Sequence, residues 1–236
     1  EASQQPKTYR KIEVAKLSPK FREATRIVSV PLPRPKENEV LFKIVWAGIN
    51  ASDINFTSGK YPFVPLVHFF LALKFLNPLQ ILAWRPAPFD AGFESIGTVV
   101  AVGDRVTRLK VGDAVLVEVV NSHIINQFLI LSLIIELVFG AFAEYQLLDA
   151  TKVSRLPAVD PSFLPLMGSG LTASLALQYS GHMTSGETVL VTGRFLTPTP
   201  KLTRFMLTIT RQPTAAAGGT GQFAVQLAKL AGNHVI

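Results

Sequence analysis

A glycine-rich segment near the end of the chain has the composition of a phosphate-binding turn. Ala217-Gly218-Gly219-Thr220-Gly221 stands before an amphipathic helix candidate. A dinucleotide pyrophosphate binds to backbone N–H groups, and glycine lets the backbone come close because it has no Cβ. A helix that follows adds the positive end of its dipole. These residues are therefore candidates for cofactor binding, and the alternative is an ordinary strand-to-helix loop.

The elements around this glycine-rich turn predict a βαβ unit. An apolar strand, the turn with its helix, and the start of another strand follow one another at residues 187–192, 215–232 and 234–236. Phe223, Leu227 and Leu230 recur at i, i+4 and i+7, so we expect them on one buried helix face. Gly232 is expected just past the helix end. This order is that of the first unit of a parallel dinucleotide-binding sheet, whose two faces one unit alone cannot cover.

The first half of the chain reads as short strands separated by turns. The strand segments are rich in Val, Ile and Phe and lie at residues 11–15, 26–30, 39–47, 97–102, 114–119 and 141–148. Gly103-Asp104 and Gly112-Asp113 mark tight turns between some of them. Strands at this spacing predict a small barrel or sandwich. Later in the chain the pattern becomes helical, with Pro161 as a first helical residue.

Composition and charge exclude several classes of function. The 236 residues include no cysteine, so disulfides, thiolate metal sites and a cysteine nucleophile are impossible. The 48% of hydrophobic and 17% of charged residues predict a folded core rather than disorder. The net charge of +7 falls largely in three atypical stretches and forms no Lys/Arg run interleaved with aromatic residues. We therefore expect no primary role in nucleic-acid binding.

Several segments, in the same order along the chain, resemble the zinc-free medium-chain dehydrogenases/reductases, the branch of quinone and enoyl reductases. Besides the strand and the glycine-rich turn, the matching segments are residues 46–55, 92–103, 111–115, 140–145 and 170–173. The resemblance implies a fold of class α/β plus β. It implies a GroES-like barrel-type catalytic domain at residues 1–158, followed by a truncated Rossmann dinucleotide-binding domain at residues 159–236. We therefore expect the chain to be the N-terminal part of a longer enzyme.

The same resemblance implies chemistry without zinc. Zinc-dependent alcohol dehydrogenases of this family carry Cys where Asn50 stands, His where Phe93 stands, and a further Cys near Gly168-Ser169. Amide, phenyl and hydroxyl side chains do not make a tetrahedral zinc site. We therefore expect no metal and no alcohol oxidation by a zinc Lewis acid. The expected reaction adds hydride from NADPH to the polarised C=C bond of an enone or quinone, and NADH is the alternative donor.

Two residues are candidates for catalysis of this reaction. Asn50 resembles a family residue near the nicotinamide or the substrate carbonyl, and its amide can both donate and accept hydrogen bonds. The alternative for Asn50 is to cap a short helix that begins around Ala51. Tyr61 resembles the catalytic tyrosine of enoyl reductases, and its phenol would donate a proton or stabilise the enolate. The alternative for Tyr61 is a half-buried side chain whose hydroxyl meets a backbone carbonyl.

Other polar residues have roles that the resemblance or the local sequence implies. Thr172 resembles the family threonine that contacts the nicotinamide carboxamide, and its alternative role is a hydroxyl bonded to its own helix backbone. Asp53 is expected to hold a turn by accepting hydrogen bonds from backbone N–H groups. The histidines have no partner cluster in the sequence, so we expect neither a metal ligand nor a catalytic base among them.

Three stretches depart from the family pattern, at residues 62–85, 121–138 and 193–214. Each stands where relatives have a short connection, and the third separates the strand at 187–192 from the glycine-rich turn. One hypothesis is that they are translated introns or gene-model errors. The other is that they are real surface insertions, which cost little loop entropy. The first two are apolar, but charged and polar residues interrupt them, so we expect no transmembrane span.

The expected function is therefore NADPH-dependent reduction of a small-molecule enone or quinone. One alternative is a catalytically incompetent fragment or mis-spliced product, and another is RNA binding of the kind that the related zeta-crystallins suggest. Because no leader is visible, we expect no signal peptide and an intracellular location in the cytosol, mitochondrion or peroxisome. No membrane partner is expected, and the full-length family member is expected to form a homodimer.

Overall fold

The computed structural model describes four ranges of the chain, residues 5–60, 87–117, 138–191 and 216–236. The chain divides into two compact units, Glu1–Pro161 and Ser162–Ile236, and each is described by itself. Tyr61 lies outside the described residues, and so do the three atypical stretches except for Val138.

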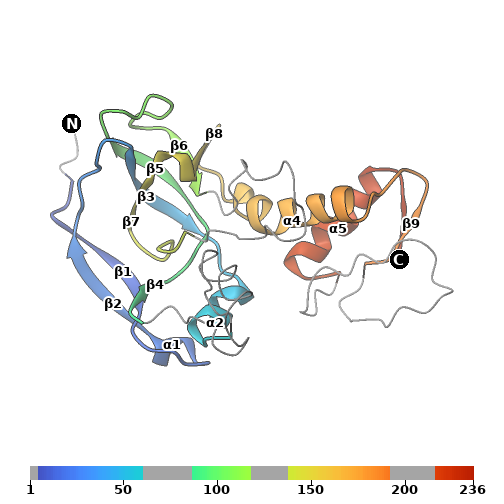
Figure 1. The fold of residues 1–236 in the computed structure, drawn as a ribbon, viewed down its shortest axis with the longest axis horizontal. Coiled ribbons are helices and arrows are strands. Elements are labelled where there is room, and N and C mark those ends of the chain that lie inside the picture. Colours follow the sequence, from blue (N-terminus) through green and yellow to red (C-terminus); the bar gives the residue numbers. More distant parts are fainter. Residues whose placement is uncertain (1–4, 61–86, 118–137, 192–215) are drawn as a thin grey trace, which may run out of the picture. The chain divides into compact units, whose positions relative to one another are not determined.

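An antiparallel sheet of five strands forms the larger part of the first unit, in the order β7-β3-β5-β6-β8 (Figure 1). Its strands are β3 (Glu39–Ala47), β5 (Ser95–Val102), β6 (Ala114–Val117), β7 (Tyr145–Asp149) and β8 (Val153–Leu156). All but β8 overlap strands that the sequence predicts. The pairing of β3 with β5 runs from Val40 opposite Val102 to Ala47 opposite Ser95, so the end of β3 lies beside the start of β5.

A smaller antiparallel sheet of three strands completes the first unit, in the order β2-β1-β4 (Figure 1). Its strands are β1 (Thr8–Val14), β2 (Thr25–Pro31) and β4 (Phe89–Asp90), and the short helix α1 (Phe21–Ala24) lies between β1 and β2 along the chain. An isolated bridge joins Lys11 of β1 to Ala143, just before β7. Two sheets linked in this way form the barrel-type domain that the spacing of short strands predicts.

Alternation of apolar residues along the strands explains the main core of this unit. Val40 and Phe42 of β3, Val99 of β5, and Val115 and Val117 of β6 are buried in one cluster. Because successive side chains of a strand point to opposite faces, alternate apolar positions place one face of the sheet in the core. The first unit is thus a β-sheet scaffold whose interior is set by branched and aromatic side chains.

The helix α2 (Ala51–Thr57) follows β3 after a short turn. Asn50 precedes the helix in an extended conformation, with φ −123° and ψ 153°, as an N-cap residue does. The sequence expectation of a short helix from about Ala51 is confirmed. This junction places Asn50 next to the end of β3, which is the part of the scaffold that carries the candidate catalytic residue.

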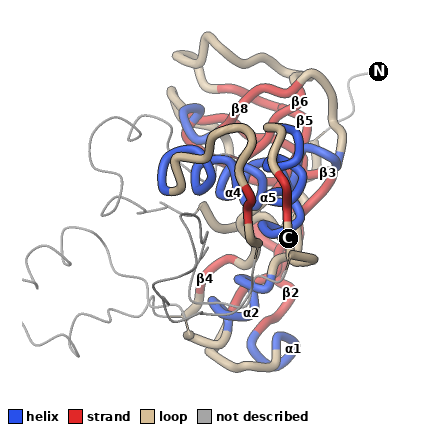
Figure 2. Tube along the Cα trace, turned by 90° about the vertical axis from the view of Figure 1, so that its right-hand side faces the viewer, coloured by secondary structure: helices blue, strands red, loops and turns tan. Residues whose placement is uncertain are grey.

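The second unit combines two helical segments with two parallel strands. A helical segment at residues 164–180 has α4 (Leu171–Leu175) at its centre, and the later elements are β9 (Thr188–Val189), α5 (Gly219–Leu230) and β10 (His234–Val235). His234 of β10 lies opposite Thr188 of β9 in a parallel pairing, so the predicted βαβ order is confirmed. Figure 2 shows α4 and α5 beside each other, and they contact one another.

Small residues make the buried face of α5. Ala224 and Ala228 are fully buried together with Ala173 and Leu177 of the other helical segment, and Phe223 and Leu227 pack against this cluster. The prediction that Leu230 shares the buried face is wrong, because its side chain is 84% exposed. Alanines let two helices approach closely, so the buried stripe follows Ala224 and Ala228 and leaves Leu230 outside it.

The end of α5 agrees with the sequence. Gly232 has φ +80°, a left-handed conformation that glycine adopts without the penalty of a Cβ. The N–H of Gly232 donates to the carbonyl of Lys229 at 3.0 Å, which closes the last turn of the helix. The chain then enters β10 directly.

Candidate active site and cofactor turn

Asn50 and Asp53 form the turn that starts α2. The backbone N–H of Asn50 donates to Oδ2 of Asp53 at 2.7 Å, and the N–H of Asp53 donates to the carbonyl of Asn50 at 3.0 Å. The side chain of Asn50 in turn faces the N–H of Asp53, and these two reciprocal contacts make a capping box. The structural role expected for Asp53 is therefore confirmed, and Asn50 also takes the capping role given as its alternative. Its amide nitrogen remains available for another partner.

That partner is Glu94, which the sequence analysis did not single out. The Nδ2 of Asn50 donates to Oε2 of Glu94 at 2.8 Å, and the N–H of Gly48 donates to the backbone carbonyl of Glu94 at 2.9 Å. The two residues are 44 positions apart and meet because β3 pairs with β5. The signal in the sequence that could have identified it is an acidic residue that directly follows Phe93 in a largely apolar segment.

Burial changes the acidity of both carboxyl groups near Asn50. Asp53 and Glu94 are only 4% and 5% exposed. Burial raises the pKa of Asp53 to about 6; the hydrogen bond from the N–H of Asn50 lowers it, and the nearby Glu94 raises it further. Burial also raises the pKa of Glu94, while the hydrogen bond from the Asn50 side chain lowers it. Perturbed carboxyl groups of this kind are frequent at functional sites.

An aromatic cluster lies next to this polar group. The ring of Phe56, from α2, makes edge contacts with Phe93 at 5.9 Å and with Phe139 at 5.2 Å between ring centroids. Phe139 also contacts Phe89 at 6.0 Å, and its backbone carbonyl accepts a hydrogen bond from the buried Gln146 at 3.1 Å. Edge contacts between rings are favourable and restrict their orientation. The cluster supplies an apolar surface beside Asn50 and Glu94.

The glycine-rich turn lies at the N-terminus of α5 in the second unit. Gly218 is the N-cap residue, no side chain caps the helix, and its first turn has no acidic residue. The first helical hydrogen bond runs from the N–H of Gln222 to the carbonyl of Gly218 at 3.0 Å. The N–H groups of Gly219, Thr220 and Gly221 therefore have no partner within the helix. A helix start of this kind fits an anionic pyrophosphate.

Gly219 lies close to the side chain of Ser169. A Cβ at this position would lie 2.7 Å from Oγ of Ser169, whose helical segment packs against α5. Ala217 and Gly219 are exposed, Gly218 and Thr220 are half-buried, and Gly221 is buried. The turn thus presents backbone N–H groups without a side-chain cap among residues that mostly lack a Cβ, and this arrangement fits the pyrophosphate of a dinucleotide.

Of the other two candidate residues, Thr172 lies within the described residues and Tyr61 does not. Thr172 is exposed, and its hydroxyl donates to the carbonyl of Gly168 at 2.6 Å, which is the local helix bond given above as its alternative role. The oxygen of that hydroxyl keeps lone pairs that can accept another hydrogen bond. Tyr61 lies outside the described residues. The structure therefore brings Asn50 together with Asp53 and Glu94 in the first unit, and Ala217 to Gly221 at one helix start in the second.

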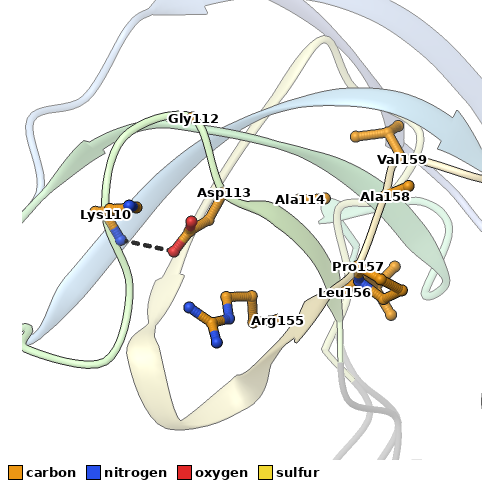
Figure 3. A pocket seen from close by; sticks show the side chains of 9 residues that line it. All are labelled: Lys110, Gly112, Asp113, Ala114, Arg155, Leu156, Pro157, Ala158 and Val159. Carbon is orange, nitrogen blue, oxygen red and sulfur yellow. Dashed lines mark hydrogen bonds between the residues drawn. The ribbon is translucent and has the colours of Figure 1, made fainter.

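An open hollow elsewhere on the first unit is a separate feature. It has a volume of about 510 Å³ and lies between the turn that precedes β6 and the segment that follows β8 (Figure 3). The backbone N–H of Lys110 donates to Oδ2 of Asp113 at 3.0 Å at its rim. Its charged side chains Lys110 and Arg155 are exposed, and none of the candidate site residues lines it. We assign it no part in the candidate site.

Two further properties concern only the part of the chain that the structure describes. Within it, no group of three or more His, Asp or Glu side chains is arranged so that it could hold a metal ion. No helix among these residues combines the length and apolar character needed to cross a membrane.

Comparison with known proteins gives a consistent family pattern. Residues 36–158, more than half of the chain, match the family model described as the alcohol dehydrogenase GroES-like domain. The chain is 36% identical over 233 residues to prostaglandin reductase-3 of Mus musculus, covering 98% of this chain and 46% of that protein. It is 33% identical over 225 residues to a probable quinone oxidoreductase of Leishmania amazonensis, covering 95% of this chain and 48% of that protein.

A solved structure of the same kind shares the fold. The crystal structure of Escherichia coli quinone oxidoreductase complexed with NADPH superposes with a TM-score of 0.60 at 25% identity, covering 96% of this chain and 51% of that chain. These matches confirm the resemblance that the motifs indicate, with the barrel-type domain followed by the start of a Rossmann-like domain. The chain spans about half the length of the curated relatives and the solved structure that it matches.

Proposed function

Because the chain belongs to the medium-chain dehydrogenase/reductase family with an alcohol dehydrogenase GroES-like domain, we propose that the protein reduces α,β-unsaturated carbonyls or quinones with NADPH. The observation that carries this proposal is the uncapped, glycine-lined N-terminus of α5, which can receive an anionic dinucleotide. The names of the relatives support the reaction class, since one is a prostaglandin reductase and the other a probable quinone oxidoreductase. The protein would therefore act on a small molecule.

The residues of the second unit would hold the cofactor. The backbone N–H groups of Gly219, Thr220 and Gly221 would bind the pyrophosphate, with Ala217 and Gly218 forming the entrance of the turn. Thr172 would accept a hydrogen bond from the nicotinamide carboxamide through its exposed hydroxyl oxygen. When bound, NADPH supplies the hydride that the acceptor needs. The Escherichia coli structure complexed with NADPH supports the choice of this nucleotide.

The residues of the first unit would act on the acceptor. Reduction of an enone leaves negative charge on its carbonyl oxygen, and a positioned donor stabilises that charge. The amide of Asn50 has two N–H donors, and only one of them is used by Glu94. We assign the second N–H to the carbonyl oxygen of the substrate. Tyr61 would supply the proton to the α-carbon, because a phenol remains protonated at neutral pH.

Zinc has no part in this proposal. A catalytic zinc site of this family needs thiolate and imidazole at the positions of Asn50 and Phe93. Here the amide of Asn50 is bound to Glu94, and the ring of Phe93 packs against Phe56. Neither side chain offers the ligand atom that such a site requires.

We further propose that the full-length protein is a homodimer. Sedimentation equilibrium measures this oligomeric state directly.

Isotope transfer tests the proposed reaction and the role of Asn50 together. We expect NADPH deuterated at C4 to give a reduced enone that is heavier by one deuterium at the β-carbon. Asn50→Leu keeps the number and branching of heavy atoms, removes both N–H donors and should lower kcat about 100-fold, as loss of an oxyanion donor does. Asn38→Leu changes an exposed asparagine of the same unit and should keep wild-type kcat. A product without deuterium, or equal rates for the two variants, would contradict the proposal.

A further inference from the structure

Glu94 is a buried carboxyl group that forms no ion pair with a described residue. Its residue is 5% exposed. Its Oε2 accepts the hydrogen bond from Nδ2 of Asn50 at 2.8 Å. A buried ionisable group is costly unless hydrogen bonds compensate for the lost hydration. Among the described residues, the hydrogen bond from Asn50 is the polar side-chain contact that stabilises Glu94 in this buried position.

The space for this carboxyl group depends on Gly48. A Cβ on Gly48 would lie 2.5 Å from Oε2 of Glu94 and 3.1 Å from its Cβ. The backbone of Gly48 has no left-handed conformation, so glycine is required there for room and not for its φ angle. The N–H of Gly48 also donates to the backbone carbonyl of Glu94 at 2.9 Å. The hydrogen bond from Asn50 and the space beside Gly48 thus fix where the Glu94 side chain can lie, and the N–H of Gly48 holds the Glu94 backbone.

Resting on the proposed function, we propose that Glu94 is a positioning residue that fixes the amide of Asn50 for the reaction. By holding one N–H of Nδ2, Glu94 determines which way the amide is turned. The second N–H of Nδ2 is then presented in one orientation, while Oδ1 faces the N–H of Asp53 in the capping box. An amide that is already oriented does not have to be ordered during the reaction, so its donor stabilises developing charge more effectively. Gly48 contributes by leaving the carboxyl group its space.

Four variants separate this role from a general contribution to folding. Glu94→Ala removes the acceptor, and Glu94→Asp keeps a carboxyl group but withdraws it by one methylene from Asn50. Glu94→Gln keeps an acceptor oxygen at the original reach, and Gly48→Ala displaces Oε2 through the added Cβ. We expect Glu94→Ala, Glu94→Asp and Gly48→Ala to lower kcat about 10- to 100-fold with a smaller change in KM. Glu94→Gln should remain within about threefold of wild type.

A second readout does not need the reaction. In the cofactor-free protein, the side-chain NH₂ signals of Asn50, assigned by their loss in Asn50→Asp, report the hydrogen bond to Glu94. We expect the two protons to be well separated in wild type and Glu94→Gln, and to merge toward solvent-like shifts in Glu94→Ala, Glu94→Asp and Gly48→Ala. Near-ultraviolet circular dichroism of each variant shows that it is folded.

The outcomes distinguish this inference from the proposed function. If the wild type does not transfer deuteride while the Asn50 signals respond as expected, the proposed reaction is wrong and the contact with Glu94 stands. If the wild type turns over and the folded Glu94→Ala and Glu94→Asp variants keep both its kcat and its Asn50 signals, the positioning role is overturned. A fall of kcat in Glu94→Gln equal to that in Glu94→Ala would also overturn it, because the hydrogen bond would then not be the cause.

Discussion

The residues around Asn50 determine the chemistry of the candidate site. Asp53 caps α2, Glu94 receives the amide of Asn50, and both carboxyl groups are buried. Burial raises the pKa of each group, and that of Asp53 reaches about 6. The site therefore contains two acids whose ionisation is opposed by their surroundings. Their titration should be visible in the stability of the protein as well as in its activity.

Asp53 should make the fold less stable as the pH rises. Its pKa is raised from 3.8 to about 6 in the folded state, so the unfolded chain loses this proton first and stability falls between about pH 4 and pH 7. Asp53→Asn cannot ionise, and its Oδ1 can still accept from the N–H of Asn50. Urea unfolding at pH 4.5 and pH 7.5 should show the variant gaining about 2 kcal/mol relative to wild type over this interval.

Asp149 provides a control in which the stability of the fold changes with pH in the opposite direction. Hydrogen bonds from the hydroxyl and the N–H of Thr151 lower the pKa of this exposed carboxyl group. The ionised form therefore stabilises the fold above the pKa of the unfolded chain, and this contribution is lost as the pH falls. Asp149→Asn should lose stability relative to wild type as the pH rises from about 2 to 5. Equal pH dependence of the two variants would contradict the environments described for these aspartates.

At the scale of elements, the start of α5 and the pairing of β3 with β5 determine what the side chains can do. The helix start offers backbone N–H groups without a competing side-chain cap. The strand pairing brings Gly48 and Glu94 together, and α2 then places Asn50 against Glu94. Each of these arrangements depends on a position where glycine leaves space, Gly219 in one case and Gly48 in the other.

Gly219→Ala should separate binding from folding. The added Cβ would meet Oγ of Ser169 at 2.7 Å, but a serine hydroxyl can rotate away, so we expect stability to change by less than about 1 kcal/mol. A side chain in this turn is also expected to hinder the approach of the pyrophosphate to the helix N–H groups, so NADPH binding should weaken by at least about tenfold. Titration of cofactor fluorescence measures the affinity, and urea unfolding measures the stability.

Gly186→Ala is the matched control for this prediction. Gly186 has φ +86° and open space around its Cα, so alanine there is strained without touching another residue. The variant should lose about 1 to 2 kcal/mol of stability and keep the affinity for NADPH. If both alanine variants lowered the affinity equally, the glycine turn would have no specific part in cofactor binding.

Local elements could be predicted from the sequence, whereas contacts between elements could not. The βαβ order, the strand at Glu39–Ala47 and the glycine turn follow from residue type and spacing, because each is a local pattern. Glu94 could not be paired with Asn50 in this way, since only the register of β3 with β5 brings them together. Leu230 was misplaced because periodicity does not show that alanines, rather than leucines, make the contact of α5.

For the molecule as a whole, the two compact units carry different parts of the proposed function. The first unit holds the residues assigned to the acceptor, and the second holds the turn assigned to the cofactor. The chain spans about half the length of its curated relatives. It includes the helix N-terminus and glycine turn that are proposed to bind the pyrophosphate.

Binding of NADPH to the 236-residue chain is the first measurement to make on the proposed reductase. Isothermal titration calorimetry of the folded protein should show saturable binding at one site, with a dissociation constant in the range of about 1 µM to 1 mM that is usual for enzyme substrates. Addition of an enone should then lead to loss of NADPH absorbance. A folded chain that binds no NADPH up to the upper end of this range would contradict the assignment of the glycine turn and the reductase function built on it.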